Sequence, residues 1–403
     1  MSERSAPRSS ALGTAARSIL SLRAVRWFEL DWHILAIAGG LLALGITLVR
    51  AMAEADDAMD RQGVDFGGHV EKILVALPML LVALAVRPRW LRRHAFLPYA
   101  GCLVLLLLLP FIGTVHNGAR RWFHVPGVGF NLQPSELAKI GLILALARVL
   151  YRNRLRALGD WGPPLALALV PMALVARQPD LGTALCFVPI TLGMLYLAGA
   201  RASVLLRFLA CAALIGGLAY QLQWGVKGYQ RQRIDTWLEG FEARDLVAAK
   251  NGAAFHSYHA RVAIGNGGVT GTGIGKGVAN RTGALPERDC DSAFALLAEE
   301  LGFLGTAAVV LLYALMIALL MGSASAIRDR FSRLAVGGIG MYFASHLFIH
   351  AAVNMGLIPM TGITLPLFST GGSSLLATFL GLGLALGLAS NREPSLDKDS
   401  FQA

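Results

Sequence analysis

From Ser292 to Gly322 the chain reads SAFALLAEELGFLGTAAVVLLYALMIALLMG. Glu299 and Glu300 are the only charged residues in this stretch. A helix of about 20 apolar residues crosses the hydrocarbon core of a bilayer, and this stretch is longer than that. Three acidic residues lie in the five positions before it: Glu287, Asp289 and Asp291. The stretch therefore predicts a membrane-spanning helix that begins beside a cluster of carboxylates.

Similar apolar runs recur along the whole chain of 403 residues, which is 55% hydrophobic and only 15% charged. Soluble domains carry about 25% charged residues, so this composition is typical of a membrane protein. The runs predict an all-α polytopic membrane protein with about ten transmembrane helices. We expect these helices to begin near Trp32, Glu71, His94, Ser135, Trp161, Leu181, Ser203, Ser292, Leu334 and Gly372.

The positions of the arginines predict the orientation of these helices. The basic segments RPRWLRRH (87–94), RVLYRNRLR (148–156) and RDRFSR (328–333) alternate correctly if all of them are cytoplasmic. The first thirty residues are polar and show no cleavable signal peptide. We expect three parts, namely a cytoplasmic N-terminal tail (1–30), a transmembrane domain (31–391) and a cytoplasmic C-terminal tail (392–403). One long extracytoplasmic loop, about 223–290, is expected between spans 7 and 8.

Charge and cysteine content narrow the classes of partner and fold. The net charge of +11 is explained by basic loops that flank membrane spans, so we expect no nucleic-acid partner. Three of the four cysteines lie inside apolar runs, and only Cys290 is expected to meet water. The sequence therefore predicts no framework of disulfides.

Two of the predicted outer loops are rich in basic residues. The loop at 223–290 contains nine lysines and arginines, and the loop at 115–136 places Arg120 and Arg121 beside Trp122. Long loops are translocated largely regardless of their charge, so these residues can simply be solvated. They can equally form a basic surface that binds an anionic substrate. The sequence leaves both interpretations open.

Two motifs in the long loop suggest ligands without defining a site. GNGGVTGTGIGKG (265–277) does not fit a nucleotide-binding motif, because no strand precedes it and no Ser or Thr follows Lys276. His256 and His259 form an H-x-x-H pair, but a structural zinc site normally needs four ligands. No cofactor is required by the sequence. Asp289 and Asp291 can still hold Mg²⁺ or Mn²⁺, since hard cations prefer oxygen ligands.

Several polar residues lie at the ends of the predicted spans. Glu136 and Lys139 are three residues apart on one helix face, where they form either a structural ion pair or part of a catalytic site. Asp180 precedes a helix and is expected to cap it. Ser373 or Ser374 can cap the last helix, whose N-terminal amide groups form a potential anion site.

The ordered set of motifs resembles the RodA/FtsW (SEDS) family of peptidoglycan polymerases, from about Asp31 to Asn391. The motifs that carry this resemblance are NGARRW, QPSELAK, QPDLGTAL, GYQRQRI, the glycine-rich loop, LPERDCDSAFALLAEELGFLG and GITLPLFSTGGSSLL. The resemblance implies a bacterial cytoplasmic-membrane enzyme that polymerises lipid II, an undecaprenyl-pyrophosphate-linked disaccharide-pentapeptide. It also implies a class B penicillin-binding protein as partner.

The same resemblance assigns roles to individual residues. It places the family's catalytic aspartate at Asp291, which would act as general base on the acceptor hydroxyl. Its apolar surroundings and two neighbouring acids should raise its pKa from about 3.9. The residues expected to contact substrate are Arg120, Arg121, Glu136, Lys139, Asp180, His256, Ser257, Lys276, Glu287, Glu300, Ser369, Gly371 and Gly372.

The chain departs from the family pattern within these motifs. Asp289-Cys290 stands where His-Thr is usual, Ser292-Ala293 replaces Phe-Ile, His256 replaces a glutamine, and Thr370 replaces a tyrosine. EELGFLG and QPDLGTALCF favour an elongation (RodA-like) over a division (FtsW-like) member. A lipid-precursor flippase and a non-catalytic scaffold are the alternatives from other classes, and a polymerisation assay with lipid II separates them from an enzyme.

Overall fold

The computed structural model describes residues 27–60, 63–116, 119–124, 131–153, 155–222, 228–242 and 255–391. The predicted tails at 1–30 and 392–403 lie outside the described residues, apart from positions 27–30. The four cysteines are all described and all free, as the sequence predicts. Cys290 is half-buried, whereas Cys211 is exposed on the outside of the helix bundle.

Within the described residues, ten apolar helices are sixteen residues or longer, which agrees with the predicted spans. The second and the ninth start earlier than predicted, at Phe66 rather than near Glu71 and at Arg330 rather than near Leu334. They are α2 (Trp32–Ala58), α3 (Phe66–Leu84), α5 (Phe96–Ile112), α6 (Pro134–Leu150), α7 (Gly162–Arg177), α8 (Leu181–Leu197), α9 (Ala202–Gln221), α14 (Ala293–Ala326), α15 (Arg330–Asn354) and α16 (Gly372–Ser390). Judged by length and composition alone, seven of the described helices are long and apolar enough to cross a membrane. The protein is therefore a multi-pass helical membrane protein.

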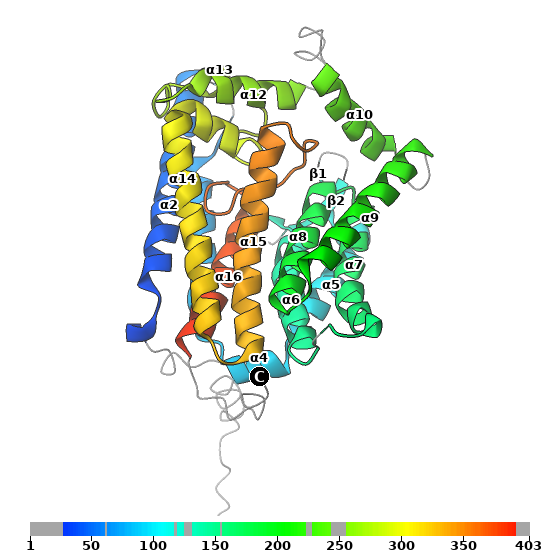
Figure 1. Ribbon diagram of the computed structural model, residues 1–403. Coiled ribbons are helices and arrows are strands. Elements are labelled where there is room, and N and C mark those ends of the chain that lie inside the picture. Colours follow the sequence, from blue (N-terminus) through cyan, green and yellow to red (C-terminus); the bar gives the residue numbers. More distant parts are fainter. Residues whose placement is uncertain are drawn as a thin grey trace, which may run out of the picture.

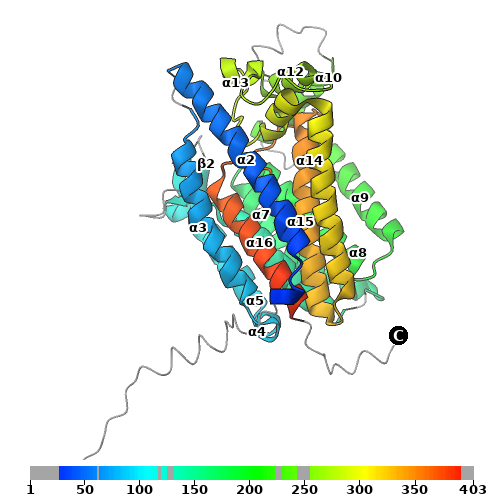
Figure 2. The same cartoon turned by 90° about the vertical axis from the view of Figure 1, so that its left-hand side faces the viewer.

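The helices run roughly parallel to one long axis and form a single bundle (Figures 1 and 2). α3 lies along α16, α14 lies along α15, and α6 contacts both α15 and α16. The first described turn of α2, the short helix α4 (Pro88–Arg93) and the end of α16 lie at one end of the bundle. α6, α15 and α16 are the most buried of these helices, so they form the centre of the bundle.

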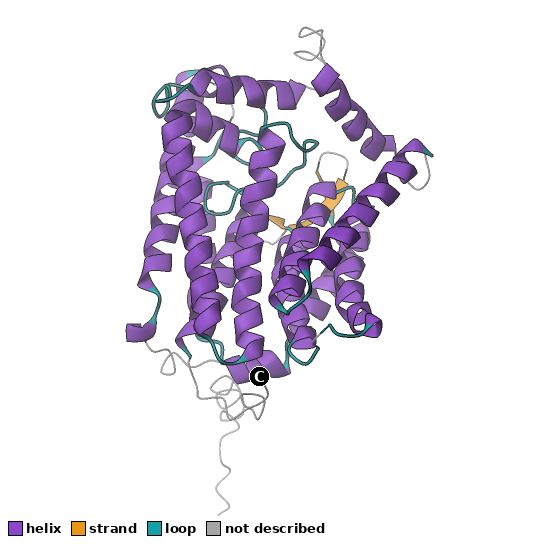
Figure 3. Cartoon of the chain, in the orientation of Figure 1, coloured by secondary structure: helices purple, strands orange, loops and turns teal. Residues whose placement is uncertain are grey.

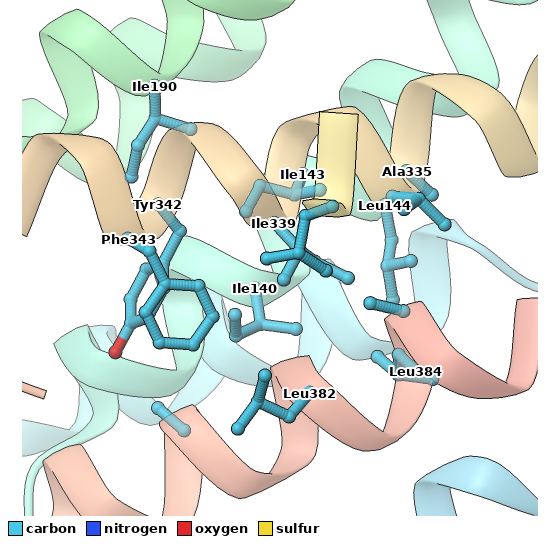
Figure 4. Packing of buried hydrophobic residues seen from close by; sticks show 14 of the residues in the cluster. Ile140, Ile143, Leu144, Ile190, Ala335, Ile339, Tyr342, Phe343, Leu382 and Leu384 are labelled. Carbon is cyan, nitrogen blue, oxygen red and sulfur yellow. The ribbon is translucent and has the colours of Figure 1, made fainter. Parts of the chain in front are cut away.

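The core is built from branched aliphatic side chains where α6, α15 and α16 meet (Figure 4). Ile140, Ile339 and Leu382 are each 1% exposed or less. The outermost helix shows the opposite pattern, because α9 buries only Leu205 among its side chains. Its remaining apolar surface is suited to lipid, which is as apolar as the side chains themselves.

The long connection between spans 7 and 8 forms helices in its described parts. α10 (Gly228–Glu242), α12 (Phe255–Gly267) and α13 (Val278–Thr282) lie across the end of the bundle opposite α4 (Figure 1). The buried guanidinium of Arg288 binds Asp56 of α2 and donates to the Asn280 carbonyl, 2.6 Å away. We call the described part of this connection the cap. Arg288 thus anchors the cap to the first span, so it is not part of a free basic surface.

A small sheet joins α5 to α6, which the sequence did not predict. β1 (Thr114–His116), β2 (Ala119–His124) and β3 (Asn131–Leu132) pair antiparallel in the order β1-β2-β3 (Figure 3). Its hydrogen bonds satisfy backbone groups of the connection. The sheet is adjacent in sequence to the start of α6, and it therefore fixes how the chain enters that helix.

Glycines bring the cap and α14 into direct backbone contact. Gly302 interrupts α14 with φ 67° and ψ −171°, a conformation that is essentially restricted to glycine. A β-carbon at Gly302 would collide with the backbone of Thr270 and Gly271. The amide groups of Phe303 and Leu304 donate to the cap instead. The glycine-rich segment therefore packs its backbone directly against α14.

We predict that Gly302→Ala destabilises the protein strongly, by more than about 3 kcal/mol, because backbone strain adds to a backbone collision. Thermal unfolding of purified protein in detergent measures the change. Gly322→Ala is the matched control on the same helix, since a β-carbon there meets no atom within 4 Å. Equal melting temperatures for the two variants would contradict this account of the kink.

Candidate active site

Asp291 lies in a tight turn directly before α14. The amide groups of Cys290 and Ser292 both donate to the Glu287 carbonyl, at 3.0 and 3.1 Å. Glu287 takes a positive φ of 44° to close this turn. No residue in the described part of the chain donates a hydrogen bond to the Asp291 carboxylate. That carboxylate faces Gly362, where a β-carbon would lie 3.3 Å from Oδ2.

The surroundings of Asp291 favour its protonated form, as the sequence predicts. Burial is the main cause and the nearby carboxylates of Glu287, Asp289 and Asp180 add to it, so the pKa of Asp291 rises to about 8. Arg233 of α10 opposes this shift. Burial and then the charge of Asp289 also raise the pKa of Glu287. The turn therefore holds a carboxyl group that titrates near neutral pH.

The loop before α16 is joined to the turn at residues 287–291, which we call the acidic turn. The Thr370 hydroxyl donates to the Asp289 carboxylate, and its amide donates to the Asp289 carbonyl at 3.0 Å. The Ser369 hydroxyl donates to the Cys290 carbonyl at 3.1 Å and accepts from the Leu365 amide at 2.8 Å. Ser369 and Thr370 thus hold the loop and the turn together beside Asp291.

Helix α15 supports the same turn from its other side. The Asn354 side chain donates to the Asp291 carbonyl at 3.0 Å. One turn earlier, His350 accepts from the Phe294 amide at 3.3 Å. Both residues are 1% exposed or less. The backbone on both sides of the Asp291 carboxylate is therefore bonded to α15.

Glu136 and Lys139 form the predicted ion pair on one face of α6. Lys139 Nζ lies 2.7 Å from Glu136 Oε1 and 2.8 Å from His346 Nε2, and its side chain is fully buried. His346 in turn contacts the Thr364 carbonyl at 3.0 Å. The geometry is that of an ion pair that joins α6, α15 and the loop before α16.

Asp180 caps α8, as the sequence predicts. Its Oδ1 accepts from the Thr183 amide at 3.1 Å, and its Oδ2 accepts from the Gln133 side chain at 2.9 Å. The Arg121 guanidinium donates to the Gln178 carbonyl at 3.0 Å and also to the Pro179 carbonyl. Arg121 therefore holds the segment that places Asp180.

The predicted serine cap of α16 is wrong. Gly371 is the N-cap, Gly372 is the first helical residue, and no side chain caps this helix. Ser373 bonds the connection before α6 instead, at 2.9 Å to the Asn131 carbonyl. Ser374 accepts from the Thr364 hydroxyl at 2.7 Å. Both hydroxyl groups therefore bind connecting segments of the chain.

The remaining predicted site residues are distributed around this centre. His256 joins it, because its Nε2 lies 2.6 Å from the Ser292 hydroxyl, and burial lowers the pKa of His256 to about 4. Ser257 is half-buried one residue further along α12. Lys276 is exposed in the glycine-rich segment, and Arg120 is exposed with its guanidinium 2.8 Å from the Pro110 carbonyl.

Glu300 and its neighbour Glu299 hold α13. Glu300 accepts from the Asn280 side chain at 2.8 Å, while Glu299 accepts from the Ala279 amide at 3.0 Å. Both glutamates are buried, and these partners satisfy the requirement that an acid inside a span be paired. Glu300 therefore contacts the cap rather than the acidic turn.

The metal hypotheses find no ligand set in the described residues. No group of three or more histidine, cysteine, aspartate or glutamate side chains is arranged there to hold an ion. Thr370 and the Cys290 thiol both bond to Oδ2 of Asp289. Among the described residues, Oδ1 of Asp289 and the carboxylate of Asp291 are therefore the oxygens left to that hypothesis.

The fold and site define a class: a multi-pass helical membrane protein with an acidic site at one end of its bundle. The sequence model of the FtsW/RodA/SpoVE family, described as "Cell cycle protein", matches residues 30–393. The chain therefore belongs to this family.

Named relatives and solved structures agree with that assignment. The chain is 32% identical over 368 residues to "Peptidoglycan glycosyltransferase MrdB" of Escherichia coli K12, covering 91% of this chain and 95% of that protein. It is 32% identical to "Probable peptidoglycan glycosyltransferase FtsW" of Aromatoleum aromaticum, covering 89% and 87%.

Two solved structures share this fold. One comes from work titled "Structural coordination of polymerization and crosslinking by a peptidoglycan synthase complex", with a TM-score of 0.76, 29% identity and coverage of 91% of this chain and 100% of that chain. The other is the Rod shape determining protein RodA of Thermus thermophilus, with a TM-score of 0.66, 28% identity and coverage of 91% and 98%.

Sequence reasoning missed the residues that support Asp291 from a distance. Arg233 is one of nine basic residues in a long connection, and nothing in the pattern distinguishes it. His350 and Asn354 lie in an apolar span, where buried polar residues are expected to be functional. Their i, i+4 spacing put them on one helix face, and this was the signal available in the sequence.

We predict that Arg121→Gln lowers the free energy of unfolding by about 2 kcal/mol, because two carbonyl groups lose a charged donor. Arg120→Gln is the matched control, since Arg120 is exposed and should contribute less than about 0.5 kcal/mol. Thermal unfolding in detergent compares them. A larger loss for Arg120→Gln would show that Arg121 does not hold the Asp180 segment.

Proposed function

We propose that this chain, a peptidoglycan glycosyltransferase, polymerises lipid II into glycan strands at the outer face of the bacterial cytoplasmic membrane. The observation that carries this proposal is the carboxylate of Asp291, which accepts no hydrogen bond from the described residues and lies at one end of the helix bundle, where burial raises its pKa to about 8. A lipid-linked donor keeps its tail in the bilayer while its sugars reach this end. An enzyme built from membrane helices suits such a substrate.

Asp291 acts as the general base in this proposal. The 4-hydroxyl of the acceptor GlcNAc attacks the anomeric carbon of the donor with inversion, and undecaprenyl pyrophosphate leaves. Asp291 takes the hydroxyl proton as the new bond forms. A base works best when its pKa lies near the working pH, and the burial of Asp291 supplies that adjustment.

The leaving pyrophosphate needs positive charge beside the acidic turn. Arg233 is suited to this role, because it is the cation whose charge acts on Asp291 and its guanidinium lies 3.3 Å from the Met360 carbonyl. The uncapped start of α16, at Gly371 and Gly372, offers backbone amide groups to an anion. Lys276 and Arg120 are exposed cations on the same side in the predicted topology. Lys139 is fully buried against Glu136 and contributes indirectly.

The orientation of the chain in the membrane follows from the positions of Asp291 and of the basic segments. The end that carries Asp291 faces outward, and the basic end with α4 faces the cytoplasm, together with both termini. We favour a role in cell elongation over one in division. A class B penicillin-binding protein is the proposed partner, which would crosslink the strands that this chain polymerises.

We predict that Asp291→Asn lowers the rate of polymerisation by about 10² to 10⁴, because the amide keeps the shape but cannot accept the proton. Purified protein with labelled lipid II, with and without its partner, measures the strands formed. Asp289→Asn should be milder, since Asp289 holds Thr370 and need not take a proton. Full activity of Asp291→Asn would place the base elsewhere, and lipid II translocation without strands would indicate a flippase.

We also predict that polymerisation rises with pH through about 8, because Asp291 must be deprotonated to act as a base. Glu287→Gln removes a negative neighbour that raises the pKa of Asp291, so the rise should move to lower pH. The control is Glu54→Gln, which changes an exposed acid on α2 that pairs with Arg50. An unchanged profile for Glu287→Gln would exclude the electrostatic coupling between these acids.

A further inference from the structure

Two histidines on α15 make the same pair of contacts one helical turn apart. Nδ1 of His346 lies 3.0 Å from the Thr364 carbonyl, and Nδ1 of His350 lies 2.7 Å from the Ile363 carbonyl. Nε2 of His346 meets Lys139 Nζ, and Nε2 of His350 meets the Phe294 amide. Both side chains are 1% exposed or less.

The partners of each ring determine its tautomer. A carbonyl oxygen can only accept, so Nδ1 must carry the hydrogen in both rings. The Phe294 amide and the Lys139 ammonium group can only donate, so Nε2 must be an acceptor. Each histidine is thus a neutral bridge between a carbonyl of the loop before α16 and a donor on another helix. Every polar atom of the two rings is satisfied in this arrangement.

The two contacts of His350 connect the backbone segments that lie next to Asp291. On one side it bonds Ile363, the neighbour of the Gly362 that the carboxylate faces. On the other side it bonds Phe294, three residues after Asp291 in the first turn of α14. Asn354 adds the bond to the Asp291 carbonyl. The backbone at Asp291, Phe294 and Ile363 is therefore bonded to one face of α15.

We propose that His350 is a positioning residue for the glycosyl transfer, which keeps the Asp291 turn and the Gly362 segment at a fixed separation. The inference rests on the proposed function of Asp291. His350 does not reach substrate, because it is buried behind the backbone that it binds. Catalytic groups must be held within about 0.5 Å of their working geometry, and residues bonded behind them provide this precision.

The test uses three variants of the full chain. His350→Phe keeps the ring but removes both bonds, and His350→Gln restores an amide N–H and a carbonyl oxygen on a flexible side chain. Tyr99→Phe is the matched control, because it removes a buried side-chain bond to a backbone carbonyl, 2.8 Å long, between α5 and α7. It should destabilise the protein without affecting the acidic turn.

The first measurement is the rate of lipid II polymerisation per folded molecule. His350→Phe should lower kcat about 10-fold to 100-fold at unchanged KM, since a small displacement of a base slows the reaction without loss of binding. His350→Gln should recover most of this loss, and Tyr99→Phe should keep wild-type kcat. The proposal would be overturned if His350→Phe raised KM without lowering kcat, or if it kept wild-type kcat. It would also be overturned if Tyr99→Phe lowered kcat as much as His350→Phe.

The second measurement needs no substrate and thus separates this proposal from the proposed function. Cys290 is half-buried in the same turn, with its Sγ 3.2 Å from the Thr370 hydroxyl. In a Cys211→Ser background, maleimide should label Cys290 about 10-fold faster in His350→Phe than in Tyr99→Phe, because local opening exposes the thiol. Equal labelling rates would overturn the positioning role. Inactive wild-type protein combined with faster labelling would overturn only the proposed function.

Discussion

The hydrogen bonds between the acidic turn and the loop before α16 determine the rest of the site. Thr370 binds Asp289 and Ser369 binds the Cys290 carbonyl, so two segments eighty residues apart become one unit. Polar backbone near a bilayer must find protein partners, since lipid offers none. These bonds fix the backbone on which the Asp291 carboxylate is carried.

Buried charged side chains, like polar backbone groups, also need partners within the protein. Lys139 lies wholly inside the bundle, where an unpaired ammonium would be expensive, and Glu136 and His346 both bind it. Glu299 accepts from the Ala279 amide, and Oε1 of Glu300 accepts from the Asn280 side chain. These acids and bases therefore join helices to one another, while the charges that can meet a substrate lie at the end of the bundle.

The cap and the bundle depend on close backbone contact as well as on charge. Gly302 and Gly271 approach so closely that neither tolerates a β-carbon, and Arg288 ties the segment before α14 to α2. α10 rests on the loop before α16 through Trp237, whose indole donates to the Gly356 carbonyl at 2.9 Å. The described helices of the long connection are consequently held against the bundle, and the charge of Arg233 on α10 acts on Asp291.

The sequence by itself determined the ten apolar helices, the cap at Asp180, and the pair at Glu136 and Lys139. Each follows from local properties, namely apolar length, helical spacing and adjacent charge. Tertiary structure alone decided that Ser373 bonds a distant connection instead of capping α16, and that Arg121 and Glu300 bind protein groups. It also placed His350 and Asn354 behind Asp291. Such roles depend on which helices pack together, and a pattern along one chain does not contain the distances between helices.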